Sequence, residues 1–370
     1  MGEKTDLSVE ATVWENIAWP GIVHLATQIS GGPTDLTDTL RVPRELGLRS
    51  DTEEQQGDLF QRALIVDVLT DCAELLGDQA KPLIEGELDY LLNRRRGDGR
   101  GWNYFPDLPE FPPDADTLSC ITIALSQAGL RADVEKYCIP ALEFALDHCV
   151  GPNGVVRTWL VPDFERTADG RLPEPWTNCL WEDSGDADVF PSLLFALHLS
   201  DPDRFAGPIA RGIDHLEQVQ RHDGGWASPF YCGRFYAIYA GLRLLSAVRP
   251  DSPAVLSAVN LLRATQHPDG GWGRRSAGSD PQSTALALLA LATVPDLLNS
   301  EDLERSARAA DYLAGSRGVD RLWPAGSLYW ILDEVGKPPT MTPFASSTLT
   351  AAFVVKASSA WRRIDTRPSL

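Results

Sequence analysis

The chain has 370 residues, of which 43% are hydrophobic and 23% are charged, and its formal net charge is −19 at pH 7. This composition is typical of a folded protein with a substantial core, and the negative charge argues against binding to nucleic acid or to anionic membrane surfaces. No uninterrupted apolar run reaches the roughly 18 residues of a membrane span, and the first 30 residues lack a basic signal-peptide segment, so we expect a cytoplasmic protein without stable membrane insertion.

Apolar residues recur with helical spacing along the chain and predict pairs of helices, each with an outer helix followed by an inner helix that is apolar nearly all round. Residues 9–30 and 53–77 supply the first pair. The remaining outer helices are expected at 81–94, 133–150, 203–220, 252–266 and 301–316, and the remaining inner helices at 117–129, 188–199, 231–248, 283–294 and 346–361.

Six antiparallel pairs predict an all-α fold, an α6/α6 toroid in a single domain. In this interpretation residues 51–370 form the barrel, and residues 1–50 pack on it or cap it, with the helix at 9–30 completing the toroid. An open superhelix of similar pairs is the alternative. Closure is favoured because the inner helices are too apolar to face water in an open groove.

A short repeat marks the turn inside each pair. The sequence QRHDGGW at residues 220–226 recurs as QHPDGGW at 266–272, and weaker copies occur at 96–102, 151–159 and 318–323. Asp and Gly suit a turn, and the Trp that follows brings a large apolar surface into the stack. We therefore expect Trp226, Trp272 and Trp323 to be structural.

Carboxylates gather where inner helices begin. Asp114 and Asp116 open the helix at 117–129, Asp186 and Asp188 repeat the pattern one pair later, and Asp280 stands at the matching place in the fourth repeat. Each acid is also a good helix cap, which is the plain structural alternative. If all inner helices start at one mouth of the toroid, the two acidic pairs meet in one cavity, and closely spaced carboxyls hold a proton at neutral pH.

The repeats resemble those of the squalene–hopene cyclase and class II terpene cyclase superfamily, and the sequence PDADT at residues 113–117 is similar to its acidic DxDD signature. The resemblance implies that Asp116 protonates an alkene of a linear isoprenoid, a prenyl diphosphate or a prenylated small molecule, with Asp114 as its partner. Thr117 stands where that signature has its last Asp. Such cyclases also usually set the cavity between two helical domains, whereas this chain predicts one.

A cyclase of this kind needs aromatic side chains around the cationic intermediate. The predicted substrate-binding residues are the aromatic residues near the expected mouth together with the second acidic pair, which would tune the proton affinity of the first: Trp102, Tyr104, Phe105, Trp181, Asp186, Asp188, Phe190, Phe230, Tyr231, Phe235, Tyr329, Trp330 and Phe344.

This chemistry requires no cofactor and no metal site, although Mg²⁺ would accompany a diphosphate held by the basic residues 94–96 and Arg100. His222 and His267 lie in predicted turns and no Asp-x-Cys sequence begins a helix, which argues against the zinc site of a protein prenyltransferase β-subunit. Two alternatives stay open: an (α/α)6 glycosidase that pairs Asp116 with Asp188 or Glu182, and a non-catalytic isoprenoid-binding protein. The oligomeric state is not determined by the sequence.

Overall fold

The computed structural model describes residues 12–32, 35–48, 52–178, 180, 187–274, 277–335 and 341–366. In this part of the chain six helices surround one axis, and each contacts the next in chain order until the last closes on the first. These inner helices are α2 (Leu59–Asp71), α5 (Ala115–Gln127), α8 (Phe190–Ser200), α10 (Phe235–Val248), α12 (Pro281–Ala292) and α14 (Ser347–Asp365). The predicted all-α toroid is confirmed.

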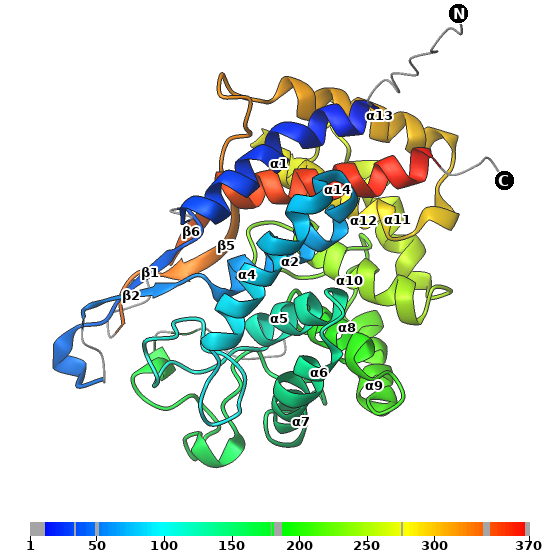
Figure 1. Cartoon of the computed structure of the whole chain (residues 1–370). Coiled ribbons are helices and arrows are strands. Elements are labelled where there is room, and N and C mark those ends of the chain that lie inside the picture. Colours follow the sequence, from blue (N-terminus) through cyan, green and yellow to red (C-terminus); the bar gives the residue numbers. More distant parts are fainter. Residues whose placement is uncertain are drawn as a thin grey trace, which may run out of the picture.

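The outer helices pack around this ring (Figure 1). They are α1 (Val13–Gly31), α4 (Ala80–Asn93), α7 (Ile139–His148), α9 (Ala206–Gln218), α11 (Pro253–Thr265) and α13 (Ser300–Gly315). Short helical segments connect the pairs: α3 (Ala73–Leu76), α6 (Arg131–Asp133), the π-helix η3 (Val134–Cys138), and the 3₁₀ helices η1 (Arg44–Leu46), η2 (Gly77–Gln79), η4 (Asp163–Glu165), η5 (Trp176–Asn178) and η6 (Pro295–Leu297).

The repeated tryptophans act as staples between helices. The indole N–H of Trp226 donates to the carbonyl oxygen of Leu216 at 2.9 Å, and that of Trp272 donates to Leu262 at the same distance. Trp102 and Trp323 make equivalent bonds to α4 and α13, and all four rings are buried. The indole thus fills the space between the helices while its polar atom stays satisfied, as a buried Trp requires.

The rest of the repeat joins one pair to the next. Gly270 has φ +90°, and a Cβ there would lie 2.4 Å from the carbonyl oxygen of Arg308 in α13. The Gln266 amide donates to Gly270 and to the carbonyl oxygen of Arg305, again in α13. Only glycine permits this close approach of turn and helix, which explains the residue type in the repeat.

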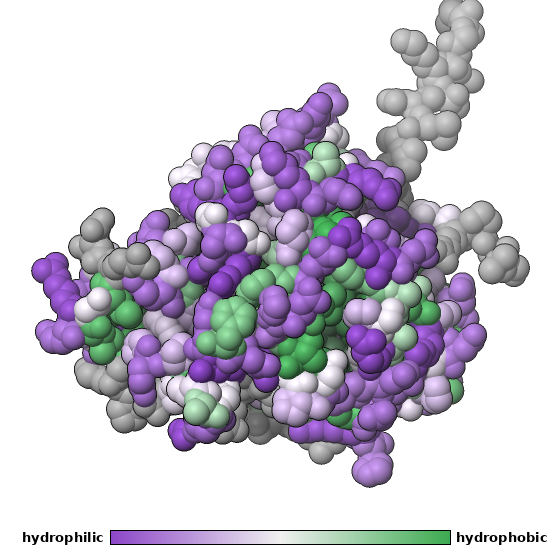
Figure 2. All heavy atoms as spheres, turned by 90° about the horizontal axis from the view of Figure 1, so that it is seen from below, coloured by the Kyte–Doolittle hydropathy of each residue, from purple (hydrophilic) through white to green (hydrophobic). Residues whose placement is uncertain are grey.

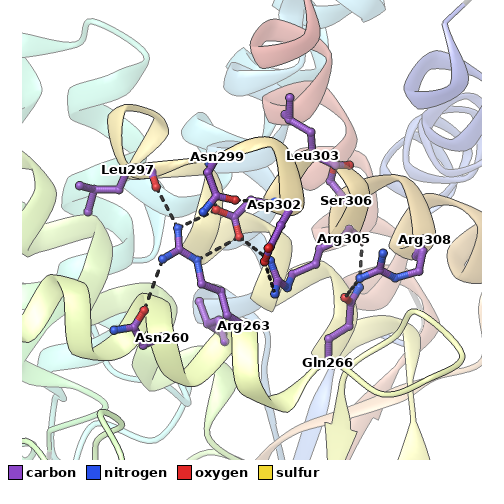
Figure 3. A network of polar contacts seen from close by, with 12 residues as sticks. Asn260, Arg263, Gln266, Leu297, Asn299, Asp302, Leu303, Arg305, Ser306 and Arg308 are labelled. Atoms are coloured by element: carbon purple, nitrogen blue, oxygen red, sulfur yellow. Dashed lines mark hydrogen bonds and ion pairs between the residues drawn. The ribbon is translucent and has the colours of Figure 1, made fainter.

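An ion pair adds a second tie between α11 and α13 (Figure 3). Arg263 donates from Nε and Nη2 to the two carboxylate oxygens of Asp302, at 3.0 and 2.6 Å. Asp302 is fully buried and also forms a capping box with Asn299 at the start of α13. A bidentate pair of this kind fixes both distance and orientation.

Three antiparallel hairpins interrupt the helices: β1 (Asp38–Arg41) with β2 (Glu54–Gly57), β3 (Gly273–Arg274) with β4 (Gly278–Ser279), and β5 (Gly326–Leu332) with β6 (Met341–Ser346). The sequence predicted none of them. Figure 1 shows β1, β2, β5 and β6 gathered on one side of the toroid, where α5 begins. A second, smaller apolar core lies there, with members from β1, from the segments before α5 and before α8, and from β5.

Several predicted helix boundaries were wrong for identifiable reasons. The helix predicted at 231–248 begins only at Phe235, because residues 230–232 pair with β5 through Cys232 N–H to Leu328 O at 2.7 Å and Trp330 N–H to Phe230 O at 3.0 Å. The segment 53–77 starts as strand β2, and 133–150 is divided by a π-helix. Backbone pairing with a distant strand thus overrides local helical periodicity.

The face seen from below in Figure 2 is mainly hydrophilic, with an apolar area near its centre. Within the described ranges, none of the helices combines the length and the apolar character needed to cross a bilayer.

Candidate active site

The two predicted acids lie together at the start of α5 but have different surroundings. Asp114 is the N-cap, and its Oδ1 accepts the backbone N–H of Thr117 at 2.6 Å. The loop is held in place because Ala115 N–H donates to Thr158 O at 2.8 Å. Asp116 follows in the first turn, so its carboxyl group has no capping duty. The capping role and the acid role therefore belong to different residues.

Asp116 is 3% exposed, and its Oδ2 accepts the hydroxyl of Tyr231. Within the described part of the chain, Oδ1 has no hydrogen-bond partner. Burial raises the pKa of Asp116 well above its ordinary value, and the charges of Asp114 and Asp188 raise it further, while the Tyr231 hydroxyl opposes them. This shift favours the protonated form of Asp116, which is the form that a general acid requires.

Burial also raises the pKa of Asp114, to about 6, although the Thr117 N–H stabilises the charged form and offsets part of the effect. Burial thus raises the pKa of both neighbouring carboxyl groups. Their hydrogen-bond partners differ, so the two pKa values differ as well. Such separation of environments is a common property of acid–base sites.

Asp188 holds the residue that bonds Asp116. Its Oδ2 accepts the hydroxyl of Ser228 at 3.0 Å, the N–H of Phe230 at 3.0 Å and the N–H of Tyr231 at 3.1 Å. The Tyr231 ring is further fixed by stacking on Tyr236, with 3.9 Å between ring centroids. The fully buried Asp188 carboxylate therefore positions Tyr231 on Asp116 and adds negative charge near it.

A narrow aromatic cavity of about 40 Å³ lies beside this pair, on the side of the hairpins. The aromatic rings of its walls pack on one another. Tyr329 stacks on Phe344 and on Phe230, with ring centroids 5.0 and 5.9 Å apart, and Phe105 packs edge to face on Phe111, with centroids 5.0 Å apart. The lining residues are Asp38, Tyr104, Phe105, Phe111, Trp159, Leu180, Phe230, Tyr329, Trp330, Ile331 and Leu332. Aromatic faces of this kind stabilise a cation.

A polar network marks one wall of the aromatic cavity. The Gln61 amide donates to the hydroxyls of Tyr104 at 2.8 Å and Tyr329 at 2.7 Å, and those two hydroxyls lie 2.7 Å apart. Gln61 and Tyr329 are 268 residues apart in sequence and both are buried. The network therefore locks the orientation of two rings that face the cavity.

A second, very small cavity of about 20 Å³ lies further inside the ring, one helical turn below Asp116, where Cys120 and Tyr236 form part of its wall. It contains ion pairs of Asp67 with Arg243 at 2.9 Å and with Lys356 at 2.9 Å. Burial alone would raise the pKa of Asp67, but the two cations outweigh it and lower that pKa to about 2. Because Tyr231 contacts Tyr236 here and Tyr329 in the aromatic cavity, the Asp116–Tyr231 pair lies between the two cavities.

The structure brings most of the predicted site residues together, but not all. Tyr104, Phe105, Phe230, Tyr329 and Trp330 line the aromatic cavity, and Phe344, Tyr231 and Asp188 contact its walls or Asp116.

Three predicted aromatics lie elsewhere. Trp102 is one of the structural staples, Phe190 faces α9, where it contacts the His215 ring, and Phe235 lines a surface pocket beside the turn before α12. Phe190 and Phe235 belong to the first turns of α8 and α10, whereas Trp102 lies in the segment between α4 and α5. Trp181 and Asp186, like Glu182, lie outside the described residues.

Sequence reasoning missed several residues of the site: Asp38, Phe60, Gln61, Phe111, Trp159 and Tyr236. Phe111 and Trp159 carried a signal, since one directly precedes the acidic sequence and the other belongs to a weak repeat. Asp38 and Gln61 carried none. The basic residues 94–96 and Arg100 do not line the aromatic cavity: Arg94 stacks on Tyr90, and Arg100 pairs with Glu165.

Comparison with known proteins gives consistent matches. A family model described as "Squalene-hopene cyclase C-terminal domain" matches residues 79–324. A squalene–hopene cyclase from Bradyrhizobium diazoefficiens is 29% identical over 281 residues, which cover 67% of this chain and 41% of the relative. An ent-copalyl diphosphate synthase from a Streptomyces species is 28% identical over 243 residues, or 57% of this chain and 46% of the relative. The chain spans less than half the length of these curated relatives.

Among solved structures, the type II terpene cyclase MstE from Scytonema superposes with a TM-score of 0.70. The two chains are 15% identical, and the match covers 95% of this chain and 99% of that one. At this identity the likeness concerns the fold alone.

Proposed function

The chain belongs to the squalene–hopene cyclase C-terminal domain family, and from this premise we propose that it is a proton-initiated cyclase of an isoprenoid. The proposed substrate is a linear isoprenoid, a prenyl diphosphate or a prenylated small molecule. The observation that carries the proposal is the buried Asp116 held by Tyr231 beside an aromatic cavity.

In the proposed mechanism Asp116 donates its proton to an alkene carbon, and the alkene π electrons form the new C–H bond. The unpartnered Oδ1 is the oxygen that can carry this proton, since Oδ2 already accepts the Tyr231 hydroxyl. That hydrogen bond stabilises the carboxylate left after transfer and so strengthens the acid. Asp114 and Asp188 act in the opposite sense, because their charges keep the proton on Asp116 until substrate arrives.

The aromatic cavity supports a hydrocarbon chain as the part of the substrate that reacts. Each aromatic face stabilises a nearby cation by about 0.5–2 kcal/mol, and the apolar walls offer few groups that could trap it. A glycosidase would need a polar cleft, so the same walls weigh against the sugar-cleaving alternative.

The comparisons suggest two substrate classes to test first. One relative is named as an ent-copalyl diphosphate synthase, and a variant of the Scytonema enzyme has been solved with its substrate, geranylgeranyl dihydroxybenzoate. Among the described residues that line the aromatic cavity there is neither Lys nor Arg. This weighs against a diphosphate group bound inside the cavity and favours a prenylated small molecule.

The test is to incubate the purified protein with farnesyl and geranylgeranyl diphosphates, squalene and a geranylgeranylated dihydroxybenzoate, and to analyse products by mass spectrometry. Asp116→Asn should abolish product formation while the fold is retained, because the amide has the same shape but no acidic proton. Asp280→Asn makes the same substitution at the partly exposed N-cap of α12 and should leave activity intact. Substantial turnover by Asp116→Asn would refute the assignment of the acid, and no product from any substrate would refute the proposed reaction.

A further inference from the structure

One carboxyl group in the aromatic cavity has no part in the mechanism described so far. Asp38 belongs to β1, where buried and exposed residues alternate, so that Asp38 and Leu40 face inward while Thr39 and Arg41 face outward. Asp38 is 4% exposed and lines the aromatic cavity. Its Oδ1 has no hydrogen-bond partner within the described ranges. An acceptor of this kind, buried and unsatisfied, is costly and invites a functional explanation.

The position of Asp38 is set by backbone pairing. β1 pairs with β2, with Asp38 opposite Gly57, and β1 is also joined to the end of β5 by Arg41 N–H to Asp333 O at 3.0 Å and Val335 N–H to Arg41 O at 2.9 Å. The hairpin is therefore attached to the same strand that carries Tyr329. Asp38 cannot move away from the cavity without breaking these bonds.

Side chains around the hairpin are equally constrained. A Cβ at Gly57 would lie 2.7 Å from the Tyr104 ring, so the glycine lets that ring pack directly on the strand opposite Asp38. The Tyr104 hydroxyl is in turn held by Gln61 and Tyr329. Asp38 therefore faces the cavity from a rigid wall, on the hairpin, while Asp116 approaches from an inner helix.

We propose that Asp38 is the base that ends the reaction. This rests on the proposed cyclase function. Its carboxylate takes a proton from the carbon next to the final cationic centre, and the electrons of that C–H bond become the new double bond. The substrate thus gains one proton from Asp116 and loses one to Asp38, so that the product is an isomer of the substrate. Exchange with solvent then resets both carboxyl groups.

The environments of the two acids agree with these opposite roles. Burial raises the pKa of Asp38 to about 7, while hydrogen bonds from the Thr39 backbone and the Tyr104 hydroxyl oppose the rise and the charge of Asp333 adds to it. Tyr104, Tyr329 and Asp333 are the titratable groups that face it in the described structure. A substantial fraction of Asp38 is therefore ionised near neutral pH, whereas the upward pKa shift of Asp116 favours its protonated form.

The first test compares the products of the wild type and Asp38→Asn near pH 8, with the substrates named above. A general base contributes about 100-fold or more, so formation of the wild-type alkene should fall by about that factor. Substrate should still be consumed, because Asp116 is intact, and alcohols or alkene isomers should replace the wild-type product. Asp280→Asn makes the same chemical change at the cap of α12, outside the cavity, and should retain the wild-type product.

A second measurement does not depend on turnover. N,N-dimethyldecylamine is a cation with an alkyl chain, and N,N-dimethyldecanamide is its neutral counterpart; their binding is compared by calorimetry near pH 8. Wild type should prefer the amine, and Asp38→Asn should weaken amine binding about tenfold with little effect on the amide, the loss expected for one charge-assisted contact.

The outcomes separate the two proposals. If wild type converts none of the substrates, the cyclase function fails, and the amine preference still decides whether Asp38 presents a negative charge to the cavity. If Asp38→Asn forms the wild-type alkene at the wild-type rate, or binds the amine as tightly as wild type does, Asp38 is not the base.

Discussion

Asp114 makes the stability of this protein depend on pH in a direction opposite to that of most carboxylates. Its pKa is about 6 in the folded protein and 3.8 in the unfolded chain, so the folded state holds the proton where the unfolded chain has released it. The contribution of Asp114 to the free energy of unfolding is complete below about pH 4 and is lost as pH rises through 6. The pKa difference corresponds to about 3 kcal/mol in all, of which about 1 kcal/mol is lost between pH 5 and pH 8.

Asp114→Asn should remove this dependence. Asn is as good an N-cap as Asp, so the bond to the Thr117 N–H can be kept while the titration disappears. Urea unfolding of both proteins should therefore show that the variant gains about 1 kcal/mol relative to wild type between pH 5 and pH 8. Carboxylates that do not interact with Asp114 cancel in the difference, whereas Asp116 does not, because the Asp114 charge raises its pKa.

Asp280→Asn, the same substitution at the cap of α12, measures what the amide does to capping alone. If the unfolding free energies of wild type and Asp114→Asn stay parallel across this pH range, burial does not shift Asp114 as argued.

Two further predictions concern the staples and the positioning of Tyr231. Trp272→Ala should lower the free energy of unfolding by about 3–5 kcal/mol, because it removes a buried ring and the bond to Leu262. Calorimetry measures this loss. A changed product profile at unchanged stability would place Trp272 in the active site instead. Asp188→Asn should lower kcat more than it changes KM, because it loosens Tyr231. A double-mutant cycle of Asp188→Asn with Tyr231→Phe should show strong non-additivity in kcat. Simple additivity would mean that the two residues act separately.

The helix pairs and the toroid could be predicted because their signals are local. The turn with Gly and Trp recurs at a fixed period. Each copy contains its own contacts, because the Trp packs against the helix just before the turn, as Trp272 does with Leu262. The acids at the start of α5 carried a signal for the same reason, since capping and helix direction place Asp114 and Asp116 at the mouth without reference to any other segment.

The cavity itself was decided by tertiary structure. Tyr231 reaches Asp116 only because Asp188 and β5 hold residues 231 and 232 out of the helix that periodicity predicts. Asp38 lies at the cavity because β1 pairs with β2 through backbone N–H and C=O groups. Every residue type except proline can supply both groups, so the side chains of the hairpin do not predict which strand it pairs with. Local periodicity therefore specifies the barrel, whereas contacts between segments far apart in the chain specify which side chains face the substrate.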